Sequence, residues 1–199
     1  MPKFCFLCQI YFICALESSL RFISHRLLAI IDHHIITHKP RIMKNVDIIV
    51  KIVAADYSEL SPAQQQLVDL ARDATLRSYA PYSQFHVGAA ILLSDGNIVT
   101  GANQENAAFP SGTCAERTAC YYAGANHPDA RFEKIAIAAR GTDGNEVDQP
   151  VPPCGACRQA LLEYEKLAGH DVEVILVGRS SIFILPSVSS LLPLSFSQF

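Results

Sequence analysis

The stretch Cys114-Ala115-Glu116-Arg117 and the stretch Pro153-Cys154-Gly155-Ala156-Cys157, forty positions later, decide how this chain folds and what it can bind. A lone cysteine and a distant Cys-x-x-Cys pair together supply three thiolates. A closed structural zinc site usually takes four protein ligands, whereas a catalytic zinc takes three and keeps one position open for water. The pattern therefore predicts that Cys114, Cys154 and Cys157 converge on one zinc ion with an open position.

Each cysteine motif stands at the start of a predicted helix. The free N–H groups and partial positive charge of a helix N-terminus stabilise thiolates. Glu116 lies beside the predicted metal, in position to take a proton from a metal-activated water and pass it on. A carboxylate in a first helical turn is by default a surface group, but its proximity to Cys114 favours catalysis. Arg117 is interpreted as a hydrogen-bond donor to the thiolates, with a surface ion pair as the alternative.

The composition describes one globular domain with a small-molecule partner. The chain has 199 residues, half of them apolar, and no apolar run reaches the ~18 residues of a membrane helix. The net charge is -3 and there is no long basic block, which argues against a general nucleic-acid surface. Seven cysteines are an odd number for a fully paired disulfide framework. Because zinc thiolates persist best in a reducing compartment, we expect a cytoplasmic protein. From the apolar runs and the charge, we expect it to contact neither membrane nor nucleic acid.

Helical and alternating patterns follow one another along the chain. Ser61-Pro62-Ala63-Gln64 is a capping box with proline in the first turn, and it predicts a helix that ends near Ser78. The stretch Val46–Val53 is rich in β-branched residues and is interpreted as a strand or an extended arm. The other predicted elements are strands at His86–Leu93, Ile98–Gly101, Lys134–Ala139, Val172–Val177 and Ile182–Leu185, a hairpin turn at Ser94–Asn97, and helices at Cys114–Ala123, stopped by Gly124, and Cys154–Lys166. This order predicts an α/β fold with a mixed sheet covered by helices.

The first 42 residues differ in character from the rest of the chain. They contain an apolar stretch with three cysteines and a segment rich in isoleucine and histidine. We expect residues 1–42 to be an extension outside the catalytic domain, either disordered or an artefact of the chosen start codon, with Met43 as the true start. The catalytic domain is expected at residues 43–199. Mass spectrometry of the native protein tests this, since abundant peptides from before Met43 would contradict it.

Three further segments extend the pattern beyond the cysteines. They are Tyr79–Ala90 (YAPYSQFHVGAA), Gly101–Ala107 (GANQENA) and Leu191–Phe196 (LLPLSF). With the two cysteine motifs, they resemble the cytidine deaminase family, in its small homotetrameric, zinc-dependent type that acts on free nucleosides. The resemblance runs from about Leu60 to Phe196. It implies a three-layer α/β/α sandwich around a mixed five-stranded sheet.

The resemblance also implies a reaction and a set of contacts. The reaction is hydrolytic deamination of cytidine, and of 2'-deoxycytidine, to uridine and ammonia by zinc-bound hydroxide attack at C4, a step of pyrimidine salvage. One Zn²⁺ per subunit would be held by the three cysteines, with Glu116 as the proton shuttle. The substrate contacts would be Phe85 against the pyrimidine, Asn103 and Glu105 on the ribose hydroxyls, the Ala115 backbone beside the base, and Phe196 from a neighbouring subunit of a homotetramer with shared active sites.

The residue pattern by itself leaves alternatives open. Without the resemblance, Phe85 would be assigned to the core, Asn103 and Glu105 to a turn or a polyol-binding pair, and Phe196 to surface packing. Phe109 stands where the family often has tyrosine, and the chain lacks the Gly-Pro that often follows the terminal phenylalanine.

Three other functions compete with deamination of a free nucleoside. One is a deaminase of another amine-bearing base, nucleoside antibiotic or polynucleotide. A second is a thiol–disulfide oxidoreductase that uses Cys154 and Cys157. A third is a zinc-stabilised binding module with Cys120 as a fourth ligand, although helical spacing turns Cys120 away from Cys114.

Overall fold

A computed structural model of the chain describes residues 43–197. The elements discussed below belong to the compact unit that begins at Ile48. The expectation of a disordered or artefactual extension at residues 1–42 lies outside the described residues. Among the residues that are described, no helix is long and apolar enough to cross a membrane.

The centre of the unit is a mixed sheet with strand order β1-β6-β5-β4-β2-β3. Strands β4 and β5 are parallel, and every other neighbouring pair is antiparallel. The strands are β1 (Val53–Ala55), β2 (His86–Leu93), β3 (Ile98–Ala102), β4 (Phe132–Arg140), β5 (Glu173–Val177) and β6 (Ile182–Leu185). The mixed sheet was predicted correctly, and β2 and β6 have the predicted bounds.

The predicted number of five strands is wrong, because β1 adds a sixth at the edge of the sheet. Val53, Ala54 and Ala55 pair with Ile184, Phe183 and Ile182 of β6. The rest of the Val46–Val53 stretch has no regular structure. A strand of three residues is too short to show the alternation that identifies a strand in a sequence, so pairing with β6 decides where it forms.

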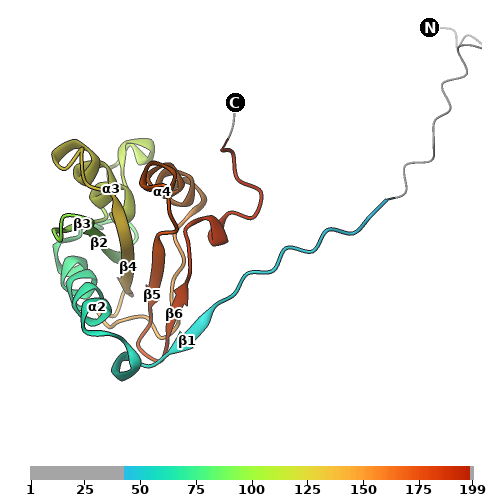
Figure 1. Ribbon diagram of the computed structural model, residues 1–199. Helices are drawn as coiled ribbons and strands as arrows, with labels where there is room; N and C mark the ends of the chain where they lie inside the picture. The colour runs from blue at the N-terminus through green and yellow to red at the C-terminus, as the bar shows by residue number, and fades with distance from the viewer. Residues whose placement is uncertain (1–42, 198–199) are drawn as a thin grey trace, which may run out of the picture. The chain divides into compact units, whose positions relative to one another are not determined.

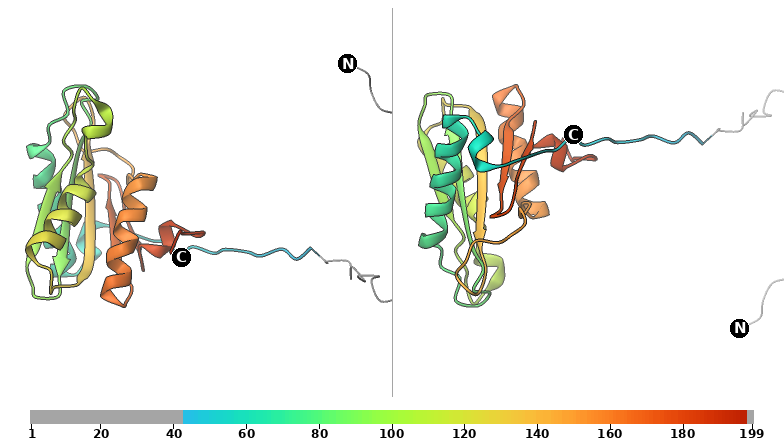
Figure 2. Two further views of the ribbon diagram at one scale, coloured as in Figure 1. Left: turned by 90° about the horizontal axis from the view of Figure 1, so that it is seen from above. Right: turned by 90° about the horizontal axis from the view of Figure 1, so that it is seen from below.

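Helices cover both faces of the sheet and make a three-layer α/β/α sandwich (Figures 1 and 2). Helix α2 (Pro62–Ala74) packs on one face through a cluster that includes Leu67, Val68 and Ala71. Helices α3 (Ala115–Asn126) and α4 (Gly155–Ala168) pack on the other face in a second cluster. Two separate cores therefore hold the central sheet in place.

The capping box predicted for α2 is present. The Gln64 backbone N–H donates to Ser61 Oγ at 3.4 Å, and the Ser61 N–H donates to Gln64 Oε1 at 3.0 Å. Pro62 occupies the first turn, where its missing N–H costs nothing. A short 3₁₀ turn, Thr75–Arg77, follows the helix, so the chain leaves helical geometry at the predicted place.

The prediction that Gly124 stops its helix is wrong, because α3 continues to Asn126. A Cβ at Gly124 would lie 2.4 Å from the hydroxyl oxygen of Tyr164. The Tyr164 ring is stacked on Phe132, with 4.6 Å between the ring centroids. Glycine is needed at this position because α3 and α4 approach closely there, which the local sequence does not reveal.

A second glycine, Gly101, allows the N-terminal turn of α3 to pack closely on the sheet. A Cβ at Gly101 in β3 would lie 2.5 Å from the Ala115 carbonyl oxygen. The first turn of α3 can therefore lie directly against the strand that leads to Asn103 and Glu105. This contact places the two predicted site segments side by side.

Candidate active site

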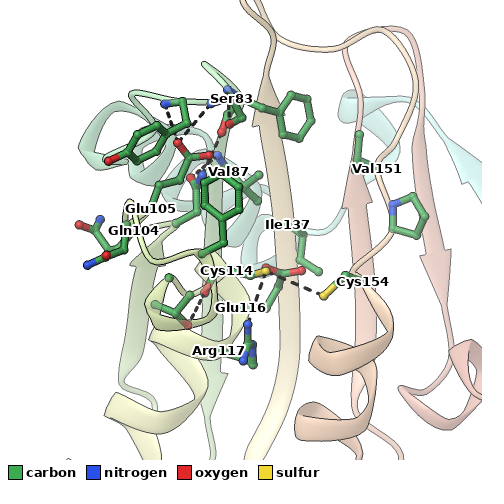
Figure 3. A pocket seen from close by; sticks show the side chains of 18 residues that line it. Ser83, Val87, Gln104, Glu105, Cys114, Glu116, Arg117, Ile137, Val151 and Cys154 are labelled. Carbon is green, nitrogen blue, oxygen red and sulfur yellow. Dashed lines mark hydrogen bonds between the residues drawn. The ribbon is translucent and has the colours of Figure 1, made fainter.

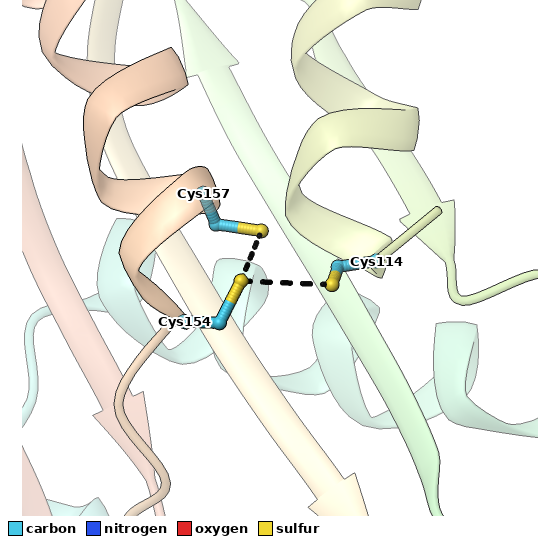
Figure 4. A group of neighbouring side chains, drawn as sticks. All are labelled: Cys114, Cys154 and Cys157. Carbon is cyan, nitrogen blue, oxygen red and sulfur yellow. Dashed lines mark hydrogen bonds between the residues drawn. The ribbon is translucent and has the colours of Figure 1, made fainter. Parts of the chain in front are cut away.

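The three predicted thiol ligands meet at the starts of two neighbouring helices (Figure 4). Cys114 is the N-cap residue of α3, Cys154 is the N-cap residue of α4, and Cys157 lies in the first turn of α4. The Sγ atoms of Cys114 and Cys154 are 3.9 Å apart, and those of Cys154 and Cys157 are 3.5 Å apart. All three Sγ atoms lie within 4.8 Å of one another.

These distances fit a zinc ion with three sulfur ligands. Zn–S bonds of ~2.3 Å in tetrahedral geometry place neighbouring sulfurs about 3.8 Å apart. The two measured distances lie on either side of that value. Cys120, the fourth ligand considered for a binding module, is fully buried, and burial raises its pKa to about 12. It is not part of the cysteine group.

The thiols shift one another's pKa values. The hydrogen bond from Cys157 holds the pKa of the Cys114 thiol well below its usual range, with a further contribution from Arg117. The same hydrogen bond raises the pKa of Cys157, because its proton is the one that is shared. Arg117 Nη2 lies 4.0 Å from Cys114 Sγ, so its guanidinium group lies against the sulfur.

Glu116 lies beside the cysteines and is almost completely buried, with 4% of its surface exposed. Burial raises the pKa of its carboxyl group, and the negative charge on Cys114 adds to the effect. Its Oε2 atom has no hydrogen-bond partner among the described residues. A buried polar atom without a partner is rare in folded proteins, and a ligand or water bound in the pocket would supply one here.

A pocket of about 720 Å³ opens above the cysteines. Figure 3 shows Glu105 and Val87 on one side, Val151 on the other, and Glu116 near Cys114 and Cys154 between them. The volume is within the range of small-molecule sites. The predicted residues that line the pocket are Phe85, Asn103, Glu105, Cys114, Glu116, Arg117 and Cys154.

The polar pair predicted for the ribose is held in place by backbone groups. Asn103 Oδ1 accepts the Val87 N–H at 2.8 Å, and Asn103 Nδ2 donates to the Phe85 carbonyl at 2.9 Å. Glu105 Oε2 accepts the N–H groups of Tyr82 and Ser83 at 2.9 and 3.2 Å. Both side chains are thus tied to the segment that carries Phe85, which gives the three residues fixed relative positions.

Two predicted substrate contacts do not line the pocket. Ala115 is the first residue of α3 and its side chain is fully buried, so only its backbone could contact a substrate. Phe196 is 70% exposed and lies on the C-terminal segment, where its carbonyl accepts a hydrogen bond from Gln159 Nε2 at 2.8 Å. It is not among the residues that line the pocket.

Sequence reasoning missed several pocket residues. The aromatic rings of Tyr82 and Phe109 meet edge to face at the pocket, with centroids 6.0 Å apart, and both rings are exposed. Val151 and Pro152, just before Cys154, form part of the wall. The sequence indicated these two residues only through their position just before the predicted ligand Cys154, because apolar residues that line a pocket form no recognisable sequence motif.

Comparison with known proteins identifies the family. Residues 61–168 match the family model described as the cytidine and deoxycytidylate deaminase zinc-binding region. A cytidine deaminase of Halalkalibacterium halodurans is 40% identical over 134 residues, covering 67% of this chain and 94% of that protein. The chain belongs to the cytidine deaminase family. A family member from Sporosarcina psychrophila is 35% identical over 134 residues, covering 67% of this chain and 91% of that protein.

Solved cytidine deaminases have the same fold. The crystal structure from Burkholderia pseudomallei is 34% identical, with a TM-score of 0.56, and covers 69% of this chain and all of that one. The structure from Mycobacterium tuberculosis is 30% identical, with a TM-score of 0.54 and the same coverage. Membership of the cytidine deaminase family makes this protein an enzyme of the hydrolase class. The oxidoreductase and binding-module alternatives are therefore set aside.

Proposed function

We propose that this protein hydrolyses the amine of cytidine, and of 2'-deoxycytidine, to give uridine or 2'-deoxyuridine and ammonia. The observation that carries the proposal is the buried Glu116 carboxylate beside three convergent thiols at a pocket, with an Oε2 atom that has no hydrogen-bond partner in the described part of the chain. Cys114, Cys154 and Cys157 would hold one zinc ion, and Arg117 would offset their charge. When bound, zinc supplies Lewis-acid activation of a water molecule near neutral pH.

Glu116 is proposed to move the protons of the reaction. It accepts one proton from the attacking water and delivers it to the ring nitrogen, and it then accepts the remaining proton of the hydroxyl group now on C4 and delivers it to the leaving amine. The water oxygen becomes the carbonyl oxygen of the product, and the amine leaves as ammonia, so the atoms balance. The environment that raises the Glu116 pKa suits this task, because the carboxyl group must both accept and release a proton.

The remaining contacts orient the nucleoside. Phe85 would pack against the pyrimidine, and the Ala115 backbone would face the base. Asn103 and Glu105 would bind the ribose hydroxyls; their hydrogen bonds to the Phe85 and Tyr82–Ser83 backbone support this, since they hold the two polar groups in fixed positions. Arg117 is the single Lys or Arg among the described residues that line the pocket, which suits an uncharged nucleoside better than a polynucleotide.

We further propose a homotetramer in which Phe196 completes the pocket of a neighbouring subunit. The exposure of Phe196, and of the aromatic pair Tyr82 and Phe109, supports a surface that a partner covers. We also propose that the catalytic domain spans residues 43–199 and acts in pyrimidine salvage in the cytoplasm. Metal analysis of the tetramer would test the expectation of one zinc per subunit.

The first test measures ammonia release from cytidine, 2'-deoxycytidine and a cytosine-containing oligonucleotide. Glu116→Ala should abolish turnover of both nucleosides while zinc is retained, because it removes the proton carrier and no ligand. Glu163→Ala, on the exposed face of α4, is the matched control and should leave turnover unchanged. Turnover of the oligonucleotide alone would contradict the proposed substrate.

A complementation experiment tests the shared site. Glu116→Ala and Phe196→Ala are each expected to be nearly inactive as homotetramers. In mixed tetramers, a Phe196→Ala subunit keeps its own Glu116 and receives Phe196 from a Glu116→Ala neighbour, so activity should reappear. Mixed tetramers that stay inactive would contradict a contribution of Phe196 across subunits.

A further inference from the structure

The C-terminal segment, residues 187–197, is hydrogen-bonded to side chains of helix α4. It follows β6 and contains only a short 3₁₀ turn, Ser189–Leu191. Its backbone is hydrogen-bonded to four side chains of α4. Three of them donate to backbone carbonyls, Arg158 to Leu191, Gln159 to Phe196 and Lys166 to Ser197. The fourth, Glu165, accepts from the backbone N–H groups of Val188 and Ser189.

The spacing of these four residues shows that they share one face. Arg158 and Glu165 are seven positions apart, as are Gln159 and Lys166. Seven residues are nearly two helical turns, about 700° of rotation, so each pair lies in line along the helix. One face of α4 therefore forms a cradle for the C-terminal segment.

Arg158 also makes a hydrogen bond to the residue before Cys154, which the other three residues do not. Its Nε donates to the Pro153 carbonyl at 2.8 Å, while its Nη1 donates to the Leu191 carbonyl at 2.9 Å. Pro153 is buried and immediately precedes Cys154, and Val151 and Pro152 line the pocket. A guanidinium group is rigid and planar, so two carbonyls bound to one such group are fixed relative to each other.

We propose that Arg158 is a positioning residue that couples the C-terminal segment to the Cys154 loop, residues 151–154. Loosening the C-terminal segment shifts the Leu191 carbonyl, and Arg158 transmits the shift to Pro153 and to the thiol of Cys154. The segment that carries Phe196 and the loop that carries a metal ligand are thereby linked through one side chain. The proposal rests on zinc binding by the three cysteines, but not on the identity of the substrate.

The test uses two conservative substitutions singly and together. Arg158→Lys keeps the charge, but its single ammonium group cannot hold both carbonyls in a fixed geometry. Glu165→Gln loosens the C-terminal segment without touching Pro153. Arg131→Lys is the matched control, since Arg131 also donates to two backbone carbonyls, those of Pro128 and Ala130, but in an exposed turn away from the cysteines.

Two readouts are independent of turnover. The rate of zinc loss to a chromophoric chelator reports on the cysteine site, and hydrogen exchange of peptides covering 151–158 and 186–197 reports on the two segments. Arg158→Lys should speed zinc loss about tenfold, the lower end of the effects seen for groups that support metal ligands. It should also speed exchange in both segments. Arg131→Lys should change neither.

The double variant distinguishes coupling from two separate effects. Glu165→Gln alone should speed exchange in 186–197 and, through the intact Arg158, speed zinc loss to a smaller extent. In the Arg158→Lys background it should add nothing to zinc loss. Zinc loss unchanged by Arg158→Lys or by Glu165→Gln, or fully additive effects, would overturn the proposal. If Arg158→Lys fails to fold, the rate of zinc loss from Glu165→Gln still tests the proposal, because an unchanged rate would overturn it. A parent protein that binds no zinc would contradict the proposed function instead.

Discussion

Replacement of Glu165 by alanine should be among the most destabilising single changes in this protein. Glu165 is buried in the last turns of α4 and accepts three backbone N–H groups from two separate segments. Oε2 accepts from Val172 at 3.0 Å and from Val188 at 2.6 Å, and Oε1 accepts from Ser189 at 3.0 Å. The side chain thus joins the start of β5 to the start of the C-terminal segment.

The size of the effect follows from the groups left without a partner. The bonds to Val172 and Val188 are buried, and a buried donor without an acceptor costs about 1–3 kcal/mol. Glu165→Ala should therefore lower the free energy of unfolding by about 4 kcal/mol, and Tm by about 8–16 °C. Glu165→Gln should cost less, because its amide oxygen can still accept from Val172 and Val188 while its NH₂ group faces the Ser189 N–H.

Urea denaturation followed by circular dichroism measures both variants, at equal protein concentration because assembly adds to apparent stability. Glu163→Ala, an exposed glutamate two positions earlier on the same helix, controls for the loss of a charge and for helix propensity. The argument would be refuted if Glu165→Ala unfolded within ~0.5 kcal/mol of the parent, as surface substitutions do. It would also fail if the glutamine variant were less stable than the alanine variant.

Three further outcomes are expected. Gly124→Ala should destabilise the protein by about 1–3 kcal/mol in denaturant titrations, although alanine is favoured by ~1 kcal/mol inside helices, because its Cβ meets the stacked Tyr164 ring. Adding Tyr164→Phe, which removes the nearest atom, should recover part of the loss, and a net gain from Gly124→Ala alone would show that α4 moves aside. Hydrogen bonds from Ser83 and the Tyr82 backbone lower the pKa of Glu105 in the folded state below its ordinary value of 4.5. The ionised Glu105 therefore stabilises the fold above pH 4.5, and this contribution is lost as the pH falls through the lower, folded-state pKa. The stability difference between the parent and Glu105→Gln should accordingly be constant near neutral pH and shrink in acid, and a difference that stays constant down to pH 3 would contradict this. Arg117→Met should weaken zinc binding about 10–100-fold in competition with a chelator, because Arg117 faces the Cys114 sulfur, whereas unchanged zinc affinity would favour the surface ion pair.

Most of the secondary structure could be predicted because its signals are local. The capping box at Ser61, the alternation in His86–Leu93 and the apolar run of Ile182–Leu185 each specify an element from neighbouring residues alone. The predictions failed where a distant segment decides the outcome. Strand β1 forms because it can pair with the edge of β6. A glycine stands inside α3 because Tyr164 occupies the space where a Cβ at position 124 would lie.

By itself, the sequence determined the chemical groups of the candidate site and where they stand on the chain. Cys114, Glu116 and the Cys154–Cys157 pair could be assigned to two helix starts because spacing and capping are short-range properties. Only the tertiary structure decided that the Oε2 atom of Glu116 is buried without a hydrogen-bond partner among the described residues, and that one face of α4 holds the C-terminal segment. Those features depend on which backbone groups and side chains meet after the sheet has assembled between its helices. Contacts of that kind join residues far apart in the chain, and they leave no periodic pattern in the sequence.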